Sequence, residues 1–308
     1  MKIGIGIGEL AGKSASMAEL AAQAQRAQDA GFACAWFANI FGADALTAVT
    51  VCGLAAKQIA FGTAVIPTYP RHPFAMAQQA VSVNAAIGHR LSLGIGLSHQ
   101  VVIENILGLS YQKSYSHMKE YLAVLAPLIR EGKVEFAGEM FRVNATLAVP
   151  DSKPCPILIA ALAPKMLALA GSVADGTITW MTGPKTLAQH IVPGITQAAT
   201  AAGRPAPRIV AGLPIAVTQD AQGARDSAAK SFRMYGVLPS YRAMLDREGA
   251  AGPADVAIVG SEAEVTGQLD RLAESGVTEF IAAPFPVKGD DDVVERTWQV
   301  LAKRARSA

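Results

Sequence analysis

The sequence has few cysteines: Cys34, Cys52 and Cys155 are the only three in 308 residues. They are odd in number, widely spaced and embedded in apolar stretches, and none belongs to a Cys-x-x-Cys pair. Neither a disulfide framework nor a zinc site is therefore indicated, and we predict no metal. We expect buried free thiols in a reducing compartment, which favours a cytoplasmic protein.

Long hydrophobic runs and an excess of one charge are missing as well. No apolar run reaches the roughly 18 residues that a membrane span requires. The stretch 1–7 is too short and too interrupted by glycine for the apolar region of a signal peptide. Basic residues number 27 and acidic residues 25, which makes nucleic acid and membrane surfaces poor partners. We expect a small-molecule substrate as the partner and a homodimer as the assembly.

A repeated strand–loop–helix unit is what the sequence does contain. Hydrophobic residues make up 51% of the chain, enough for a sizeable core. Eight short apolar runs, each followed by a helical pattern, lie at residues 2–7, 33–38, 59–65, 91–96, 156–161, 177–181, 208–217 and 278–283. Such runs, which do not alternate with polar residues, indicate strands buried on both faces and hence a parallel sheet. Eight units of this length predict an α/β fold, a (β/α)8 TIM barrel with insertion segments that spans residues 1–308 as one domain.

A doubly wound open sheet is the alternative fold. Its dinucleotide-binding form would carry Gly-x-Gly-x-x-Gly after the first strand, at the start of a helix. Here Gly4, Gly6 and Gly8 instead alternate within the strand. The barrel is therefore the preferred prediction.

Two insertions and several helix starts can also be placed. Residues 136–141 resemble a hairpin turn, and residues 236–253 break the repeat with extra Gly and Pro, as expected of a lid over one face of the barrel. Ser16 with Glu19 forms a capping box before the first helix. We also expect Asp220 to cap a helix, and Ser98 to cap a short helix at residues 101–107.

The active site of such a barrel lies at the carboxyl ends of its strands. Those ends carry neither a pair of carboxylates nor a cluster of metal ligands, and Glu9 is the only carboxylate among them. Hydrolysis by paired acids or by a metal is therefore not indicated, and an organic cofactor is expected to supply the chemistry. The residues at these ends are Gly8, Glu9, Asn39, Ala64, Val65, Ser98, His99, Ala161, Leu162, Ala163, Trp180, Thr182, Pro214, Pro284 and Phe285.

The stretch 61–73 and its surroundings suit a flat cofactor with a phosphate. Three prolines between positions 67 and 73 fix the path of a loop, and small residues before it leave room for a ring. Leu97 and Ser98 precede one predicted helix, and Ala161, Leu162 and Ala163 precede another. Backbone N–H groups at such positions bind anions, although most helix starts carry no ligand.

Histidine and tryptophan supply the remaining candidates. His99 is the best acid or base because it stands at a strand end and titrates near neutrality; the alternative is a polar loop residue. Trp180 could stack on a planar ring or belong to the core. The remaining assignments are structural: packing for His72, exposed helix ends for His89 and His190, a helix face for His117, and the core for Trp36.

With these motifs in place, the chain resembles the luciferase-like flavin and deazaflavin oxidoreductases, and within them the coenzyme F420-dependent branch of actinobacteria. The resemblance extends over most of the chain in the right order. The motifs that carry it are Gly62-Thr-Ala-Val-Ile-Pro67, Arg71-His-Pro73, Gly88-His-Arg90, Leu93-Gly-Ile-Gly-Leu-Ser-His99, Ile159-Ala-Ala-Leu-Ala-Pro164, Ala170-Gly171 and Ala174-Asp-Gly176.

The resemblance implies a bulge after the third strand, where a non-prolyl cis peptide backs the deazaflavin ring. This bond maps to Ala64–Val65. The phosphate cradle of the family maps to Leu97, Ser98 and the run Ala161, Leu162, Ala163. Further cofactor contacts are expected at Asn39, His99, Ala160 and Trp180.

Two departures from the family pattern refine the expected activity. His99 stands where the sugar-phosphate dehydrogenases of this branch carry an acidic residue, and Asn39-Ile40 replaces their Asp-His pair. Both argue for a reductase that delivers hydride from reduced coenzyme F420, with His99 as the proton donor or acceptor. An FMN-dependent monooxygenase and a non-catalytic flavin-binding or deazaflavin-binding protein are the alternatives.

Overall fold

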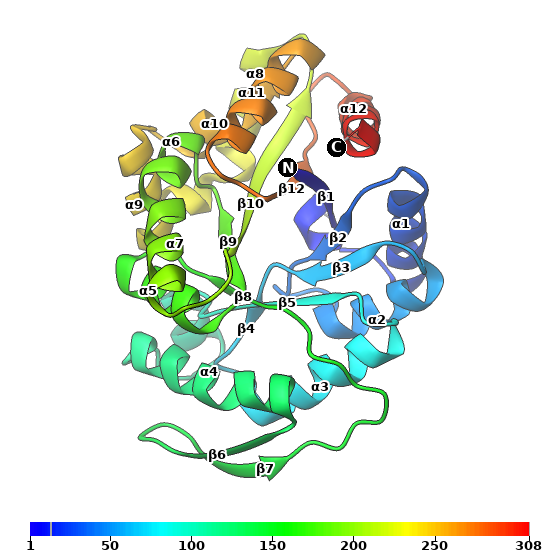
Figure 1. Ribbon diagram of the computed structural model, residues 1–308. Helices are drawn as coiled ribbons and strands as arrows, with labels where there is room; N and C mark the ends of the chain where they lie inside the picture. The colour runs from blue at the N-terminus through cyan, green and yellow to red at the C-terminus, as the bar shows by residue number, and fades with distance from the viewer. Residues whose placement is uncertain (13, 308) are drawn as a thin grey trace.

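A parallel sheet closes into a barrel in this computed structural model, which describes residues 1–12 and 14–307 (Figure 1). β9 pairs with β10, β10 with β12 and β12 with β1, so the ring of strands has no open edge. The prediction of a (β/α)8 barrel is confirmed. Its staves are β1 (Lys2–Ile7), β2 (Cys34–Phe37), β3 (Ala60–Thr63) continued by β4 (Ile66–Pro67), β5 (Leu91–Gly96), β8 (Ile157–Ala160), β9 (Gly176–Trp180), β10 (Arg208–Val217) and β12 (Glu279–Pro284).

Helices surround the barrel on all sides in Figure 1. Within the part of the chain that the structure describes, no helix combines the length and apolar character needed to cross a membrane. The helices are α1 (Met17–Asp29), α2 (Ala45–Ala55), α3 (Pro73–Ala86), α4 (Ser114–Glu131), α5 (Pro164–Val173), α6 (Pro184–Thr186), α7 (Val192–Ala201), α8 (Ala221–Ser231), α9 (Pro239–Glu248), α10 (Pro253–Val256), α11 (Glu262–Glu274) and α12 (Val293–Ser307).

Two predicted helix caps are confirmed. The hydroxyl of Ser16 accepts from the backbone N–H of Glu19, whose carboxylate accepts in return from the N–H of Ser16, so the capping box is complete. Asp220 accepts from the N–H of Gly223 at the start of α8. These caps bind backbone donors that the first helical turn leaves without partners.

The inserted segments match the predictions in part. The strands β6 (Lys133–Ala137) and β7 (Arg142–Thr146) form the predicted hairpin, which lies outside α4 (Figure 1). Most of the predicted insertion at residues 236–253 is the helix α9, although its Gly and Pro content gave no sign of a helix. The strand β11 (Ile258–Gly260) was not predicted. It pairs with the second half of β10, and three residues are too few to show a period.

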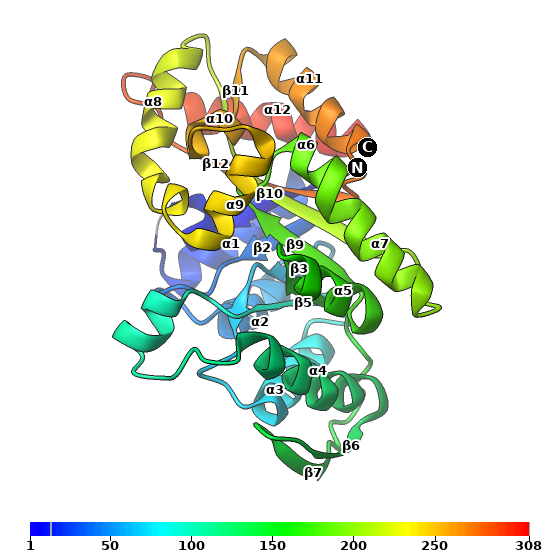
Figure 2. The ribbon, with the colours of Figure 1, turned by 90° about the vertical axis from the view of Figure 1, so that its left-hand side faces the viewer.

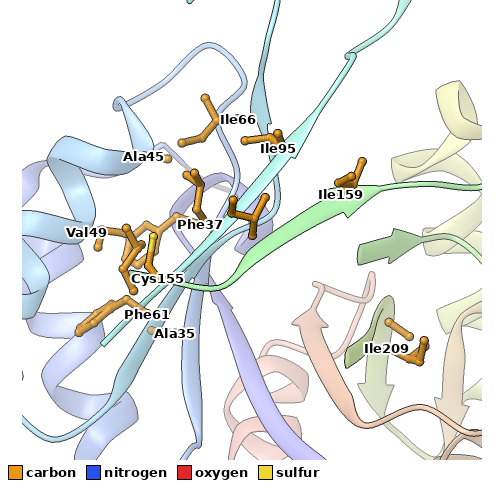
Figure 3. Close-up of a cluster of buried hydrophobic side chains, with 14 of the residues drawn as sticks. Ala35, Phe37, Ala45, Val49, Phe61, Ile66, Ile95, Cys155, Ile159 and Ile209 are labelled. Carbon is orange, nitrogen blue, oxygen red and sulfur yellow. The ribbon is translucent and has the colours of Figure 1, made fainter. Parts of the chain in front are cut away.

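Side chains at alternate positions of the strands point to opposite sides of the sheet. One set packs against the surrounding helices, and the other fills the interior of the barrel. Phe37 and Phe61 point outward, with ring centroids 6.3 Å apart, and Figure 3 shows them beside Val49 of α2. The other positions fill the barrel with a second cluster that includes Trp36, Leu158, Ile178, Val210 and Ile281. Trp36 is fully buried, as predicted.

Glycines make room for Trp36 inside the barrel. A Cβ atom on Gly4 would lie 2.7 Å from its ring nitrogen, and one on Gly62 would lie 2.3 Å from its ring carbons. Its Nε1 donates to Glu279, which also accepts from Arg208. Trp36 and its neighbours thus fill the interior of the barrel at the level of Gly4 and Gly62.

Arg90 ties together the ends of two helices. Its guanidinium donates to the carbonyl of Gly53 at 2.8 Å, to that of Ala56 at 2.8 Å, and to those of Ile59 and Ile87. All four carbonyls lie at or just beyond the ends of α2 and α3, where the last carbonyls of a helix have no N–H partner within the helix.

We expect Arg90→Ala to lower the free energy of unfolding by about 3 kcal/mol, because charge-assisted bonds are lost and part-buried carbonyls are left unpaired. Urea denaturation followed by circular dichroism measures the change. Arg247→Ala, at an exposed position on α9, is the control and should shift stability by less than about 0.5 kcal/mol. Equal effects of the two substitutions would refute the role given to Arg90.

Candidate functional site

The chain bulges between β3 and β4, at the carboxyl end of the barrel. The peptide bond between Ala64 and Val65 is cis, as the resemblance implied. The buried hydroxyl of Thr63 donates to the carbonyl of Gly94 at 2.8 Å and accepts from its N–H at 2.9 Å. A side chain thus replaces the two ladder bonds that the bulge interrupts.

Three of the predicted stretches meet at this bulge. A Cβ atom on Gly96 would lie 2.6 Å from Cγ2 of Val65 and 3.1 Å from Cβ of Ala160. The ends of β4, β5 and β8 therefore approach within van der Waals contact. The predicted shelf therefore lies next to the strand ends that lead into the two predicted phosphate loops.

The loop after β5 presents backbone donors. Ser98 has a φ of 60°, the left-handed conformation that turns neighbouring N–H groups toward one side. The hydroxyl of Tyr111 donates to the Ser98 carbonyl at 3.1 Å. The N–H groups of Leu97, Ser98 and His99 donate to no backbone or side-chain acceptor among residues 1–12 and 14–307. Ser98 does not cap the next helix, so that prediction was wrong: the helical segment at residues 101–106 begins after Gln100 with no side-chain cap.

The loop after β8 follows the same plan. The hydroxyl of Thr177 donates to the carbonyl of Ile159 at 2.8 Å. In the described ranges, the N–H groups of Ala161, Leu162 and Ala163 also donate to no acceptor. Two sets of unused donors thus stand on adjacent strands, an arrangement that suits a phosphate.

His99 belongs to the loop after β5 and faces a helix from the inserted segment. The side chain is half-buried, and its ring centroid lies 5.5 Å from that of Tyr241 on α9. Burial lowers the pKa of His99 below its ordinary value of 6.5. A mainly neutral imidazole at pH 7 can accept a proton, and lower pH makes it a donor.

Trp180 faces the interior from the end of β9. A Cβ atom on Gly212 would lie 2.8 Å from its ring. Its buried Nε1 has no hydrogen-bond partner among the described residues.

Aromatic rings connect Trp180 to His99 across the carboxyl end. Ring centroids are 5.9 Å apart for Trp180 and Tyr235, and 5.1 Å apart for Tyr235 and Tyr241. Tyr241 then contacts His99. In Figure 2 the segment after β5 and α9 lie on the same side of the barrel. This aromatic row, Trp180–Tyr235–Tyr241–His99, extends over the candidate site.

Two predicted residues have structural contacts that limit their chemistry. The side-chain oxygen of Asn39 accepts from the N–H of Ala45 at 3.0 Å, which fixes the orientation of the amide and uses one lone pair of that oxygen. The carboxylate of Glu9 accepts from the N–H groups of Ile40, Phe41 and Gly42. Glu9 therefore shapes the loop after β2.

The other histidines take structural positions. His72 caps α3 by accepting from the N–H of Phe74 at 3.2 Å, in line with its predicted packing role. His117 is buried and stacked 4.0 Å from Tyr69, and burial lowers its pKa to about 4. His89 is exposed, as predicted. The prediction for His190 was wrong: it is half-buried, and its Nε2 lies 2.7 Å from the carbonyl oxygen of Leu162.

Sequence reasoning missed Thr63, Tyr111 and Tyr241. Thr63 lies inside the stretch 61–73 that the sequence analysis singled out, but among other small residues it gives no sign of a special role. The two tyrosines come from segments remote in sequence from the strand ends that they contact. A tyrosine in a segment that follows a strand end is the only signal that would have pointed to them.

The chain is similar to known proteins along most of its length. Residues 2–279 match the sequence model of the family described as luciferase-like monooxygenase. A 5,10-methylenetetrahydromethanopterin reductase from Archaeoglobus fulgidus is 29% identical, over 90% of this chain and 84% of its own. An F420-dependent glucose-6-phosphate dehydrogenase from Beutenbergia cavernae is 28% identical, over 80% of this chain and 70% of its own.

A solved structure supports the fold. The coenzyme F420-dependent tetrahydromethanopterin reductase from Methanopyrus kandleri superposes with a TM-score of 0.81, covering 99% of this chain and 98% of its own. At 18% identity this likeness concerns the fold alone.

Proposed function

Because the chain belongs to the luciferase-like monooxygenase family, we propose that it is a coenzyme F420-dependent oxidoreductase that reduces a small organic substrate. The observation that carries the proposal is the meeting of the Ala64–Val65 bulge with two loops of unused N–H donors. A flat ring fits the first, and a phosphate fits the second. The relative from Beutenbergia cavernae, named F420-dependent, supports this cofactor.

The residues that would hold the cofactor can be named from their contacts. Ala64 and Val65 would back the ring, and Gly96 and Ala160 carry no larger side chain that would block it. The N–H groups of the two loops would bind the phosphate. The free Nε1 of Trp180 and the amide NH2 of Asn39 are donors for ring or substrate oxygens.

His99 is the proposed acid. When bound in its reduced form, the cofactor supplies a hydride from ring carbon C5. The unsaturated or carbonyl-bearing substrate then needs a proton, and the imidazole of His99 is placed at the strand end to donate it. In the opposite direction the neutral imidazole would accept that proton.

The aromatic row is the proposed wall of the substrate pocket. Tyr235 and Tyr241 come from residues 232–248, next to Met234 and Val237, which are 59% and 67% exposed. We propose that α9 and this segment form a lid that excludes water from the reaction. Such a wall favours an apolar substrate over a charged one.

The departures at positions 39 and 99 support a reductase. The family pattern for sugar-phosphate oxidation needs an acidic residue and an Asp-His pair. This chain has His99 and Asn39-Ile40 there, and Asn39 is also engaged by Ala45. We therefore do not propose a sugar phosphate as substrate.

Fluorescence titration of the purified protein with F420 and with FMN tests the proposal. We expect saturable binding of F420 and weak binding of FMN. Tight retention of FMN with negligible binding of F420 would support the monooxygenase alternative instead. Binding of F420 without oxidation of its reduced form by any of a broad panel of enones and quinones would indicate a non-catalytic protein.

A further inference from the structure

We propose that His190 is a positioning residue for the cofactor phosphate: it holds the Leu162 carbonyl away from the anion. This inference rests on the proposed function, because it assigns the loop after β8 to the phosphate. It concerns a residue that touches neither the ring nor the reacting atoms.

The hydrogen bond itself fixes the state of the imidazole. Nε2 of His190 lies 2.7 Å from the carbonyl oxygen of Leu162. A carbonyl only accepts, so Nε2 must carry the proton and donate. The carbonyl is thereby turned toward the helix that bears His190. A carbonyl facing the phosphate would repel it, whereas the N–H groups of Ala161, Leu162 and Ala163 attract it.

Helix packing brings His190 to this loop. His190 lies in a wide turn of π-type, Leu187–Ile191, between α6 and α7. The next helix, α7, is held close against α5, because a Cβ atom on Gly171 would lie 2.4 Å from the carbonyl oxygen of Ile195. A Cβ atom on Gly194 would lie 3.4 Å from Cδ1 of Leu167 in the middle of α5. α7 therefore starts alongside α5, and the π-type turn before it places the imidazole at Leu162, just before α5 begins.

The neighbouring contacts repeat the same arrangement. The hydroxyl of Thr177 donates to the carbonyl of Ile159 at the end of β8 and, at 3.4 Å, to that of Ala161 in this loop. Tyr111 donates to the carbonyl of Ser98 in the other loop. In each loop, a side chain from another element donates a hydrogen bond to a backbone carbonyl. The adjacent backbone N–H groups have no acceptor in the described structure. His190 is thus one member of a set that leaves donors for an anion.

The test compares two ligands that differ in the phosphate. F420 carries it, and the F420 fragment that ends at the ribityl chain does not. We expect His190→Ala to weaken the binding of F420 by about five- to twentyfold and to change the binding of the fragment by less than twofold. His190→Gln, whose amide NH2 reaches to the same place, should restore most of the F420 affinity. Fluorescence titration of the wild type and of both variants with each ligand measures the six dissociation constants.

Controls separate positioning from general damage. His89→Asn, at an exposed site with a φ of 64° that suits asparagine, should change neither affinity. The turnover at saturating F420 should fall less than twofold in His190→Ala, since the ring and His99 are untouched. Equal losses for both ligands, or no loss for either, would overturn the inference. A wild-type protein that binds neither ligand would instead overturn the cofactor assignment, which makes the two failures distinguishable.

Discussion

Replacing His99 by alanine should lower turnover by roughly 10²–10⁴-fold, the usual contribution of a positioned acid or base. His99 combines a titratable imidazole just after the end of β5 with a neighbouring aromatic wall, through its 5.5 Å contact with Tyr241. The backbone donors of its loop do not depend on the imidazole, so F420 affinity should change less than threefold. Stopped-flow oxidation of reduced F420 with a substrate from the panel measures the turnover. Unchanged turnover would return His99 to the role of a polar loop residue.

The pH dependence of the wild-type enzyme offers a second readout of the same role. Burial lowers the pKa of His99 below 6.5, so the donor form disappears as the pH rises through a value below neutrality. For reduction, log kcat/KM should therefore be flat at low pH and fall by one unit per pH unit above that pKa. For the reverse oxidation the neutral imidazole is the active form, and the profile should rise with pH and then level off. Both breaks should vanish in His99→Ala.

Prediction from sequence succeeded where the signal is local. The strands of the barrel are short apolar runs. A run that is apolar on both faces must be buried on both faces, which is typical of a strand in a parallel sheet. The capping box of Ser16 and Glu19 was found in the same way, because its signal lies within four consecutive residues. The bulge at Ala64–Val65 came from the family resemblance, since no local pattern specifies it.

Prediction failed where a distant element decides the role of a residue. His190 was placed on an exposed helix end, and the packing of α7 on α5 brings it to Leu162. Thr63 gained its importance from Gly94, 31 residues away in sequence. In each case the partner is set by the closed barrel, which the sequence near the residue does not encode.

Replacing Gly94 by alanine should remove the cofactor shelf. Its Cβ atom would lie 1.9 Å from the carbonyl oxygen of Thr63 and 2.5 Å from Cδ1 of Ile178. A backbone atom cannot yield as a flexible side chain does, so the bulge must move, and the two hydrogen bonds between Thr63 and Gly94 break with it. We expect F420 affinity to fall by roughly 100-fold or more and the free energy of unfolding to fall by about 3 kcal/mol.

Gly267→Ala on α11 is the matched control for this loss. There the added Cβ atom meets only the tip of Arg271, at 3.8 Å, and alanine suits a helix interior better than glycine. That variant should gain about 0.5–1 kcal/mol in stability and keep its F420 affinity. Urea denaturation and fluorescence titration of both variants supply the comparison. If Gly94→Ala bound F420 as the wild type does, the ring could not lie against the bulge that Gly94 supports, and the cofactor would have to be placed elsewhere at the carboxyl end of the barrel.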